Sequence, residues 1–131
     1  GISVAKALAM GLGGKIKASL DKALALEPRH AEAHIALGAY NAEVVAKVGG
    51  LVAGLTYGAS KDAAVKHYEE ARRLTPDSAI ARIEYANGLM ALFGKSKLAA
   101  ATKLYQEAAA SKPRNAMERL DQQAAIEELE D

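Results

Sequence analysis

Two histidines in the segment HAEAH are the first residues whose spacing could support metal chemistry. His30 and His34 are four residues apart, so on a helix both imidazoles would share one face, as the zinc ligands of a helical metalloprotease motif do. That motif places a glutamate directly after the first histidine, whereas Glu32 is the second residue after it and faces elsewhere. Because Pro28 lies two residues before His30, we expect His30 to lie in the turn after the proline. The sequence therefore favours structural roles for both histidines and predicts no metal site.

The segment FGKS at 93–96 carries the glycine, lysine and serine that end a phosphate-binding loop. That loop also needs a glycine at position 89 and a strand before it. Position 89 is Leu89, Gly88 is one residue too early, and a helix is expected before the segment. We therefore interpret FGKS as a turn between two helices, with Gly94 ending the first of them.

The remaining polar side chains are expected on solvated helix faces. His67 stands alone beside Tyr68, and we expect it to be exposed to solvent. The arginines after Ala71 are offset by nearby acids, for example in a predicted pair of Glu69 with Arg73, four residues apart. No local spacing of serine, histidine and acid indicates a nucleophile with its base. We therefore expect a protein that is not an enzyme and needs no cofactor.

Composition excludes several classes of function. The 131 residues contain no cysteine, which excludes disulfides, thiol catalysis and cysteine-bound metals. Seventeen basic residues oppose sixteen acidic ones, and a net charge of +1 gives no general attraction to nucleic acid. No apolar run has the roughly 18 residues that a membrane span needs. The chain starts with GISVAKALAMGLGG, without an initiator methionine, so we interpret it as part of a longer chain from the cytoplasm or the bacterial periplasm.

Composition and the three prolines together predict an all-α fold. Alanine, leucine, lysine and glutamate lose little side-chain entropy in a helix, and the period-two alternation typical of strands is missing. Pro28, Pro76 and Pro113 each follow an alanine by five residues and a large apolar residue by eight. Because proline ends a helix, each of the three marks a tight turn between two helices. The repetition predicts one domain built as a superhelix, or solenoid, of antiparallel helix pairs.

At these residues the sequence resembles the tetratricopeptide repeat family, whose repeat is a pair of antiparallel helices called A and B. The resemblance covers about residues 16–120. In the second repeat, at 31–76, the matching residues are His34, Leu37 and Gly38 in helix A and Ala64, Tyr68, Ala71 and Pro76 in helix B. In the third repeat, at 79–113, helix B matches at Ala101, Tyr105, Ala108 and Pro113, whereas Arg82, Tyr85 and Ala86 match helix A poorly.

The two ends of the chain depart from a full repeat. Residues 1–28 are a partial first repeat, in which the B helix is expected from Ile16 to Leu26. Residues 116–131 are predicted to form a solvated capping helix with one apolar side, made of Met117, Leu120, Ala124 and Leu129. The good helix N-caps Ser78 and Asn115 follow the second and third prolines.

The second repeat is longer than the family's by an insertion that we place at 44–60. Its apolar residues keep helical spacing, and its glycines at 50, 54 and 58 recur every four residues. We expect helix A to continue into the insertion and a glycine-rich loop to lead on to helix B.

The resemblance implies that the A helices line a concave binding surface. The residues of this chain at the surface positions are Glu32, Ile35, Ala39, Ala42 and Glu43 in the second repeat and Ile80, Ile83, Asn87, Met90 and Ala91 in the third. Chaperone-binding members of the family hold a peptide carboxylate with a lysine and an asparagine at two of these positions. Only Asn87 is retained here, so we predict no such clamp. The small, apolar lining suits an apolar helix or an extended segment, or it is filled by the insertion itself.

Two functions remain open at this point. The first is a scaffold that binds a protein or peptide partner through the concave surface, or that associates with a second copy as a homodimer. The second is a periplasmic transporter-accessory or small-ligand-binding protein, because similar insertions occur in tetratricopeptide-like periplasmic lipoproteins associated with transporters. In that case the glycine-rich insertion would shape the pocket. Neither function involves nucleic acid or a membrane span in this chain.

Overall fold

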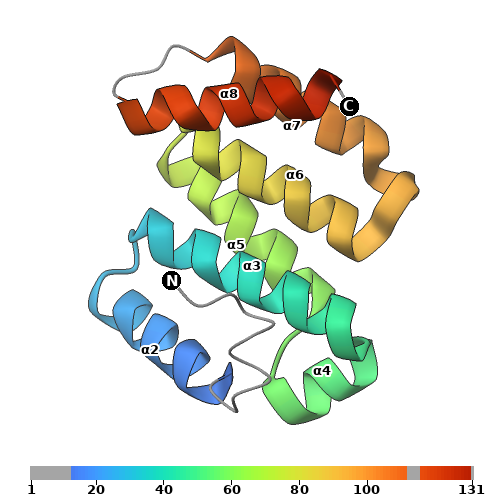
Figure 1. Cartoon of the computed structure of the whole chain (residues 1–131). Helices are drawn as coiled ribbons and strands as arrows, with labels where there is room; N and C mark the ends of the chain where they lie inside the picture. Colours follow the sequence, from blue (N-terminus) through green and yellow to red (C-terminus); the bar gives the residue numbers. More distant parts are fainter. Residues whose placement is uncertain (1–12, 112–115, 131) are drawn as a thin grey trace.

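The computed structural model describes residues 13–111 and 116–130, and every regular element in this part of the chain is a helix (Figure 1). In chain order the elements are α2 (Gly13–Leu26), α3 (Ala31–Val48), α4 (Gly50–Tyr57), α5 (Lys61–Leu74), α6 (Ala79–Phe93), the short 3₁₀ helix η1 (Gly94–Lys97), α7 (Leu98–Ala110) and α8 (Ala116–Glu130). The prediction of an all-α fold is confirmed. Pro113, Asn115 and residues 1–12 lie outside the described residues.

The predicted helix boundaries follow from local capping. His30 is the N-cap of α3, where its Nδ1 accepts a hydrogen bond from the backbone N–H of Ala33 at 3.1 Å. Ser78 caps α6 in the same way, through its Oγ and the N–H of Ala81. Each cap satisfies a backbone donor that the first turn of a helix leaves unpaired. Gly94 ends α6, as the sequence predicts.

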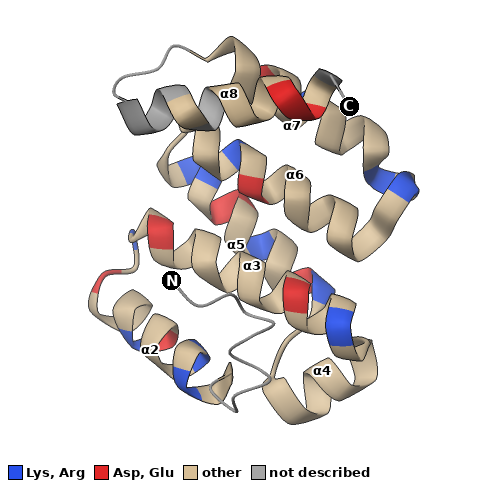
Figure 2. Ribbon diagram, in the orientation of Figure 1, with Lys and Arg blue, Asp and Glu red and all other residues tan. Residues whose placement is uncertain are grey.

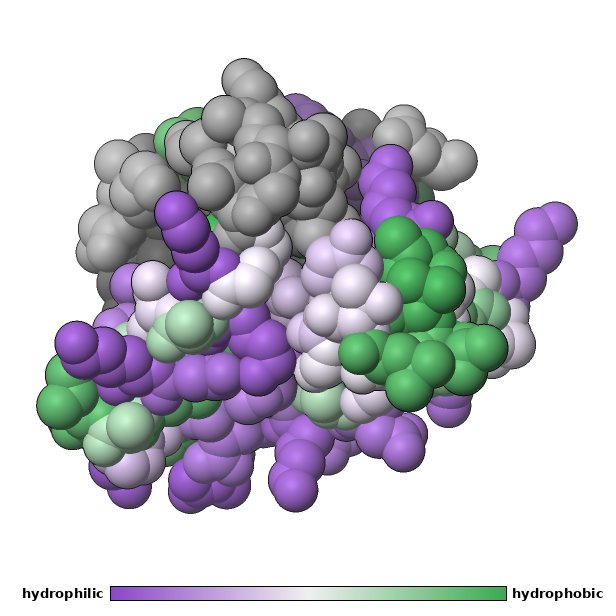
Figure 3. All heavy atoms as spheres, turned by 90° about the horizontal axis from the view of Figure 1, so that it is seen from below, coloured by the Kyte–Doolittle hydropathy of each residue, from purple (hydrophilic) through white to green (hydrophobic). Residues whose placement is uncertain are grey.

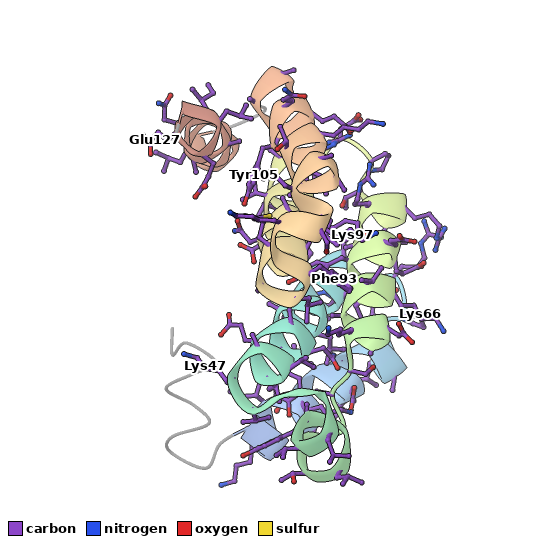
Figure 4. The ribbon with its side chains drawn as sticks, turned by 90° about the vertical axis from the view of Figure 1, so that its right-hand side faces the viewer. Lys47, Lys66, Phe93, Lys97, Tyr105 and Glu127 are labelled. Carbon is purple, nitrogen blue, oxygen red and sulfur yellow. The ribbon has the colours of Figure 1, made fainter. Side chains whose placement is uncertain are left out.

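The helices pack as hairpins that follow one another along the molecule. The most extensive contacts join α3 to α5 and α6 to α7, and α3 also packs against α6. Helix α8 then packs on α7 and α6, whereas α2 packs on α3 (Figures 1 and 4). Helix α2 and helix α8 therefore lie at opposite ends of the array.

Small residues permit the close approach of neighbouring helices. Four alanines of α5 and α7 are fully buried: Ala64, Ala71, Ala101 and Ala108. Leu37 and Gly38 on the facing side of α3 are buried as well. The alanines, Leu37 and Gly38 of the repeat signature are thus core residues, whereas Pro76 is exposed in the turn after α5. A larger side chain at the core positions would need space that a close-packed interior lacks.

The ring of Tyr68 joins α5 to two other helices at once. A Cβ atom on Gly38 of α3 would lie 2.9 Å from three atoms of the ring, and a Cβ atom on Gly88 of α6 would lie 2.5 Å from its Cε2. Both distances are shorter than carbon atoms tolerate. The ring also stacks on Tyr85, with centroids 5.4 Å apart and planes 9° from parallel. The two glycines therefore provide the space in which the buried ring sits.

The same positions recur in the neighbouring hairpins with complementary sizes. When the prolines are aligned, one position is occupied by Leu20, Tyr68 and Tyr105. A second position, at a constant separation from the first and in the A or capping helix that follows, is occupied by Tyr40, Gly88 and Ala125. The large Tyr40 is 1% exposed where the preceding helix supplies a leucine, and Ala125 is 0% exposed where it supplies a tyrosine. In the sequence alignment each pair of positions therefore combines a larger residue with a smaller one.

The insertion at 44–60 is mostly helical. Helix α3 continues to Val48, the chain changes direction at Gly49 with φ +84°, and α4 follows until Gly58, which is left-handed with φ +62°. Tyr40 donates a hydrogen bond to the carbonyl oxygen of Tyr57 at 3.2 Å, which ties the insertion back to α3. The expected continuation of helix A and a short loop before α5 are both present, and the extra helix α4 lies between them.

We predict that Gly88→Ala lowers the free energy of unfolding by about 1–3 kcal/mol, because the added methyl group overlaps the buried Tyr68 ring. The change is measured by urea denaturation. Gly54→Ala is the matched control, since its Cβ would meet nothing closer than 3.9 Å in the interior of α4. There the better helix propensity of alanine should raise stability by up to about 1 kcal/mol.

A double-mutant cycle locates the clash. Tyr68→Leu opens space, so the combined variant with Gly88→Ala should lose less stability than the two single changes added together. Strict additivity would show that Gly88 and the ring do not compete for the same space.

Candidate partner-binding groove

The structure separates the predicted concave-surface residues into exposed and buried ones. On α3, Glu32 is exposed while Ile35, Ala39 and Glu43 are half-buried and Ala42 is buried. On α6, Ile80, Asn87 and Ala91 are exposed and Met90 is half-buried. Ile83 is 6% exposed and belongs to the hydrophobic core, so it is not available to a partner.

Two of these residues, Asn87 and Met90, line a cavity of about 500 Å³. Its other walls come from α7 and α8, and the remaining lining residues are Leu98, Thr102, Tyr105, Glu128 and Leu129. Figure 4 shows Tyr105 on the side of α7 that faces α8. We call this cavity, formed by α6, α7 and α8, the α6–α8 groove.

A hydrogen bond between Tyr105 and Asn87 orients the polar groups of the groove. The hydroxyl of Tyr105 donates a hydrogen bond to Oδ1 of Asn87. Burial raises the pKa of Tyr105, and the carboxylates of Glu128 and Glu84 raise it further. The hydroxyl therefore stays protonated at neutral pH and remains a donor. Because Asn87 accepts that bond through its oxygen, its amide N–H₂ group can donate to a bound molecule.

Apolar side chains form the sides of the same groove. Leu98 of α7 is 50% exposed, Leu129 of α8 is 38% exposed, and Met90 of α6 is half-buried. Apolar walls with a few fixed polar groups are typical of sites that bind a ligand or an apolar peptide segment.

Sequence reasoning missed the α7 and α8 walls of the groove. Leu98, Thr102 and Tyr105 follow the spacing of one helix face, and this signal could have found the α7 wall. On α8, Leu129 belongs to the predicted apolar side and does line the groove, whereas the prediction is wrong for two other described residues of that side. Leu120 is 66% exposed and Ala124 is exposed, whereas Ala125 is the buried residue.

Arginine side chains beside the α5–α6 turn are engaged within the protein. Arg82 donates to the carbonyl oxygens of Pro76 and Ser78 and forms an ion pair with Glu107 at 3.2 Å. The predicted pair of Glu69 with Arg73 is wrong. Arg73 pairs with Glu70, and Glu69 instead accepts a hydrogen bond from the hydroxyl of Tyr85 at 3.0 Å. Arg82 therefore links α6 to α7 and to the turn that precedes α6, whereas the pair of Arg73 with Glu70 lies within α5.

The expectation that His67 is solvated is also wrong. His67 is half-buried, and its Nδ1 lies 3.0 Å from Nδ1 of His34. Nε2 of His34 lies 3.0 Å from the carbonyl oxygen of Pro28, so Nε2 must carry a proton. With its proton on Nε2, His34 accepts a hydrogen bond at Nδ1 from the Nδ1–H of His67, and the pair ties α3 to α5. His30, which the sequence paired with His34, caps α3 instead.

The histidine pair is arranged to share a proton. The ring centroids are 5.3 Å apart while the two nitrogens are 3.0 Å apart, so the nitrogens point head-on at each other. A shared metal ion would need lone pairs that converge on a third point. Among the described residues no group of three or more histidine, aspartate or glutamate side chains is placed to hold a metal ion.

With the geometry described, the chain was compared with models of known families, with curated proteins and with solved structures, and no match was found. Within the described part of the chain, no helix combines the length and the apolar character that a membrane span requires.

We predict that stability falls as the pH drops below about 6.5, the ordinary pKa of histidine. Burial, and then the neighbouring His34, lower the pKa of His67. The unfolded chain therefore binds a proton more readily than the folded one, so the contribution of His67 is present above pH 6.5 and is lost on acidification. Urea midpoints at pH 7.5 and pH 5.5 measure the effect.

His67→Gln removes the titrating group and should flatten this pH dependence. The exposed pair of Glu70 and Arg73 does not interfere, because Arg73 lowers the pKa of Glu70 below its ordinary value and that carboxylate titrates at lower pH. An equally steep loss of stability in His67→Gln would contradict the assignment.

Proposed function

We propose that this protein is a non-catalytic scaffold that binds an apolar helix or extended segment of a partner protein in the α6–α8 groove. We further propose that its hairpins are divergent tetratricopeptide-like repeats, with α3 and α6 as A helices and α5 and α7 as B helices. The sequence signature supports this, since Tyr68, Ala71 and Tyr105 are buried where such repeats need them.

The observation that carries the proposal is the α6–α8 groove itself. Two residues that the repeat register assigns to the binding surface, Asn87 and Met90, line it. A partner segment could place an apolar side chain against Leu98, Leu129 and Met90 while its backbone accepts a hydrogen bond from the Asn87 amide. Peptide recognition commonly combines such apolar anchors with a few backbone hydrogen bonds.

Charge at the edge of the groove narrows the class of partner. Glu128 is exposed beside Leu129, and Figure 2 shows acidic residues in the C-terminal part of α8. An acidic residue next to an apolar groove favours a basic residue on the partner and disfavours an acidic one. We therefore propose an apolar segment flanked by lysine or arginine.

A small molecule is the second candidate, because a volume of about 500 Å³ lies within the range of small-molecule sites. It is not the transporter-accessory site of the sequence analysis, because no residue of the insertion at 44–60 lines this groove. It differs from the first in that a free ligand would fill the cavity without contacting the exposed rim of the groove at Leu98.

Selection from a displayed library of random peptides tests the proposal. We predict that the selected peptides are apolar with basic flanks, and that they shift the ε-methyl resonance of Met90 in NMR spectra. Leu98→Arg should weaken their binding at least about tenfold, because it places a charge at the rim of the apolar contact.

Leu51→Arg is the matched control, since Leu51 is 76% exposed on α4, which contributes nothing to the groove. Its affinity for the peptides should equal that of the unmodified protein. Peptides that bind Leu98→Arg as tightly as Leu51→Arg, or a selection that enriches nothing, would contradict a peptide-binding groove there.

A further inference from the structure

The two ends of the helical array carry opposite charge. Residues 116–131 contain six acidic residues and one basic residue, whereas residues 1–115 contain sixteen basic and ten acidic ones. At the other end, α2 contains three lysines and one aspartate. Figure 1 shows α2 and α8 at opposite ends of the molecule, so these charges cannot meet within one copy.

The outward face of α2 combines positive charge with an exposed leucine. Lys15, Lys22 and Leu26 recur at intervals of seven and four residues, which puts them on one side of the helix. All three are exposed, and Leu26 is 79% exposed. Lys17 is paired with Asp21 at 2.7 Å, but Lys15 and Lys22 form no ion pair with any described residue.

Helix α4 extends this apolar character at the same end. Leu51 and Leu55 are 76% and 80% exposed. Figure 3, which views this end from below, shows hydrophobic residues gathered at the right, over α4, with hydrophilic ones beside them. The α2 end thus presents lysines next to leucines.

The outward face of α8 has the complementary character. Leu120, Ala124 and Glu127 are exposed at intervals of four and three residues, and buried Ala125 lies on the opposite side of the helix. Figure 4 shows Glu127 on the side of α8 away from α7. This face presents a leucine next to a carboxylate, and no described residue covers it.

We infer that the outward face of α8 docks on the α2 end of a second copy of this chain, so that copies associate head to tail. The second copy is favoured over other occupants because one molecule carries both complementary faces: lysines and exposed leucines at one end, carboxylates and an exposed leucine at the other. Pairing two α8 faces would instead oppose like charges. A contact between different faces is heterologous, and it continues from copy to copy unless it closes into a ring.

Sedimentation equilibrium of the full chain tests this directly. In about 0.02 M salt the average mass should rise with protein concentration beyond that of a dimer. In about 0.5 M salt, charges attract one another over only a few ångströms, so the average mass should fall back towards that of the monomer. A chain that stays monomeric up to about 1 mM in low salt, or stops at a dimer, would overturn the inference.

Two variants with one end blocked make the test specific to the faces. Lys15→Glu with Lys22→Glu blocks the α2 end, and Leu120→Gln with Glu127→Gln blocks α8. Each variant alone should associate at least about tenfold more weakly than the unmodified chain. All four residues are exposed, so circular dichroism spectra should be unchanged.

Mixing the two variants is the decisive step. The first keeps an intact α8 and the second keeps an intact α2 end, so together they should form a one-to-one dimer and nothing larger. A mixture that remains monomeric, or blocked variants that associate as well as the unmodified chain, would refute the assigned faces. Leu98→Arg, in the α6–α8 groove, should associate normally, which separates this surface from the groove.

Discussion

The packing of this protein depends on one buried aromatic ring and on two residues that lack a side chain. Tyr68 is 2% exposed and lies where α3, α5 and α6 meet. Gly38 approaches the face of its ring, since a Cβ there would be equally far from three ring atoms, and Gly88 approaches its hydroxyl end. Burial raises the pKa of Tyr68 well above its ordinary value, and the phenol stays neutral. The ring thus fixes the distance between one hairpin and the next.

The groove occurs where the residue aligned with Gly88 is larger than glycine. When the prolines are aligned, Ala125 on α8 corresponds to Gly88 on α6, and Tyr105 corresponds to Tyr68. Tyr105 is 9% exposed, compared with 2% for Tyr68, and it lines a cavity of about 500 Å³. The same architecture therefore gives a filled interface at one site and a hollow one at the next.

The elements were more predictable from the sequence than the contacts between them. Prolines, caps and alanine spacing predicted the starts of α3, α6 and α8 correctly, because helix ends are decided by local chemistry. The contact of His34 with His67 was not predictable, since the two residues are brought together by packing across 33 positions. The apolar side of α8 was predicted wrongly at Leu120 and Ala124 for a related reason. The buried side of this helix is decided by its packing on α7 and α6, and Ala125 is the residue that is fully buried.

The ¹H chemical shifts of the Gly38 α protons test the central claim most directly. The proton that takes the place of a Cβ points at the Tyr68 ring face, where ring current shields it. The account predicts a strong upfield shift for that proton, a clear difference between the two α protons, and loss of both effects in Tyr68→Leu. Two α protons with ordinary and nearly equal shifts, unchanged in Tyr68→Leu, would show that the ring does not lie against Gly38 and would contradict the account.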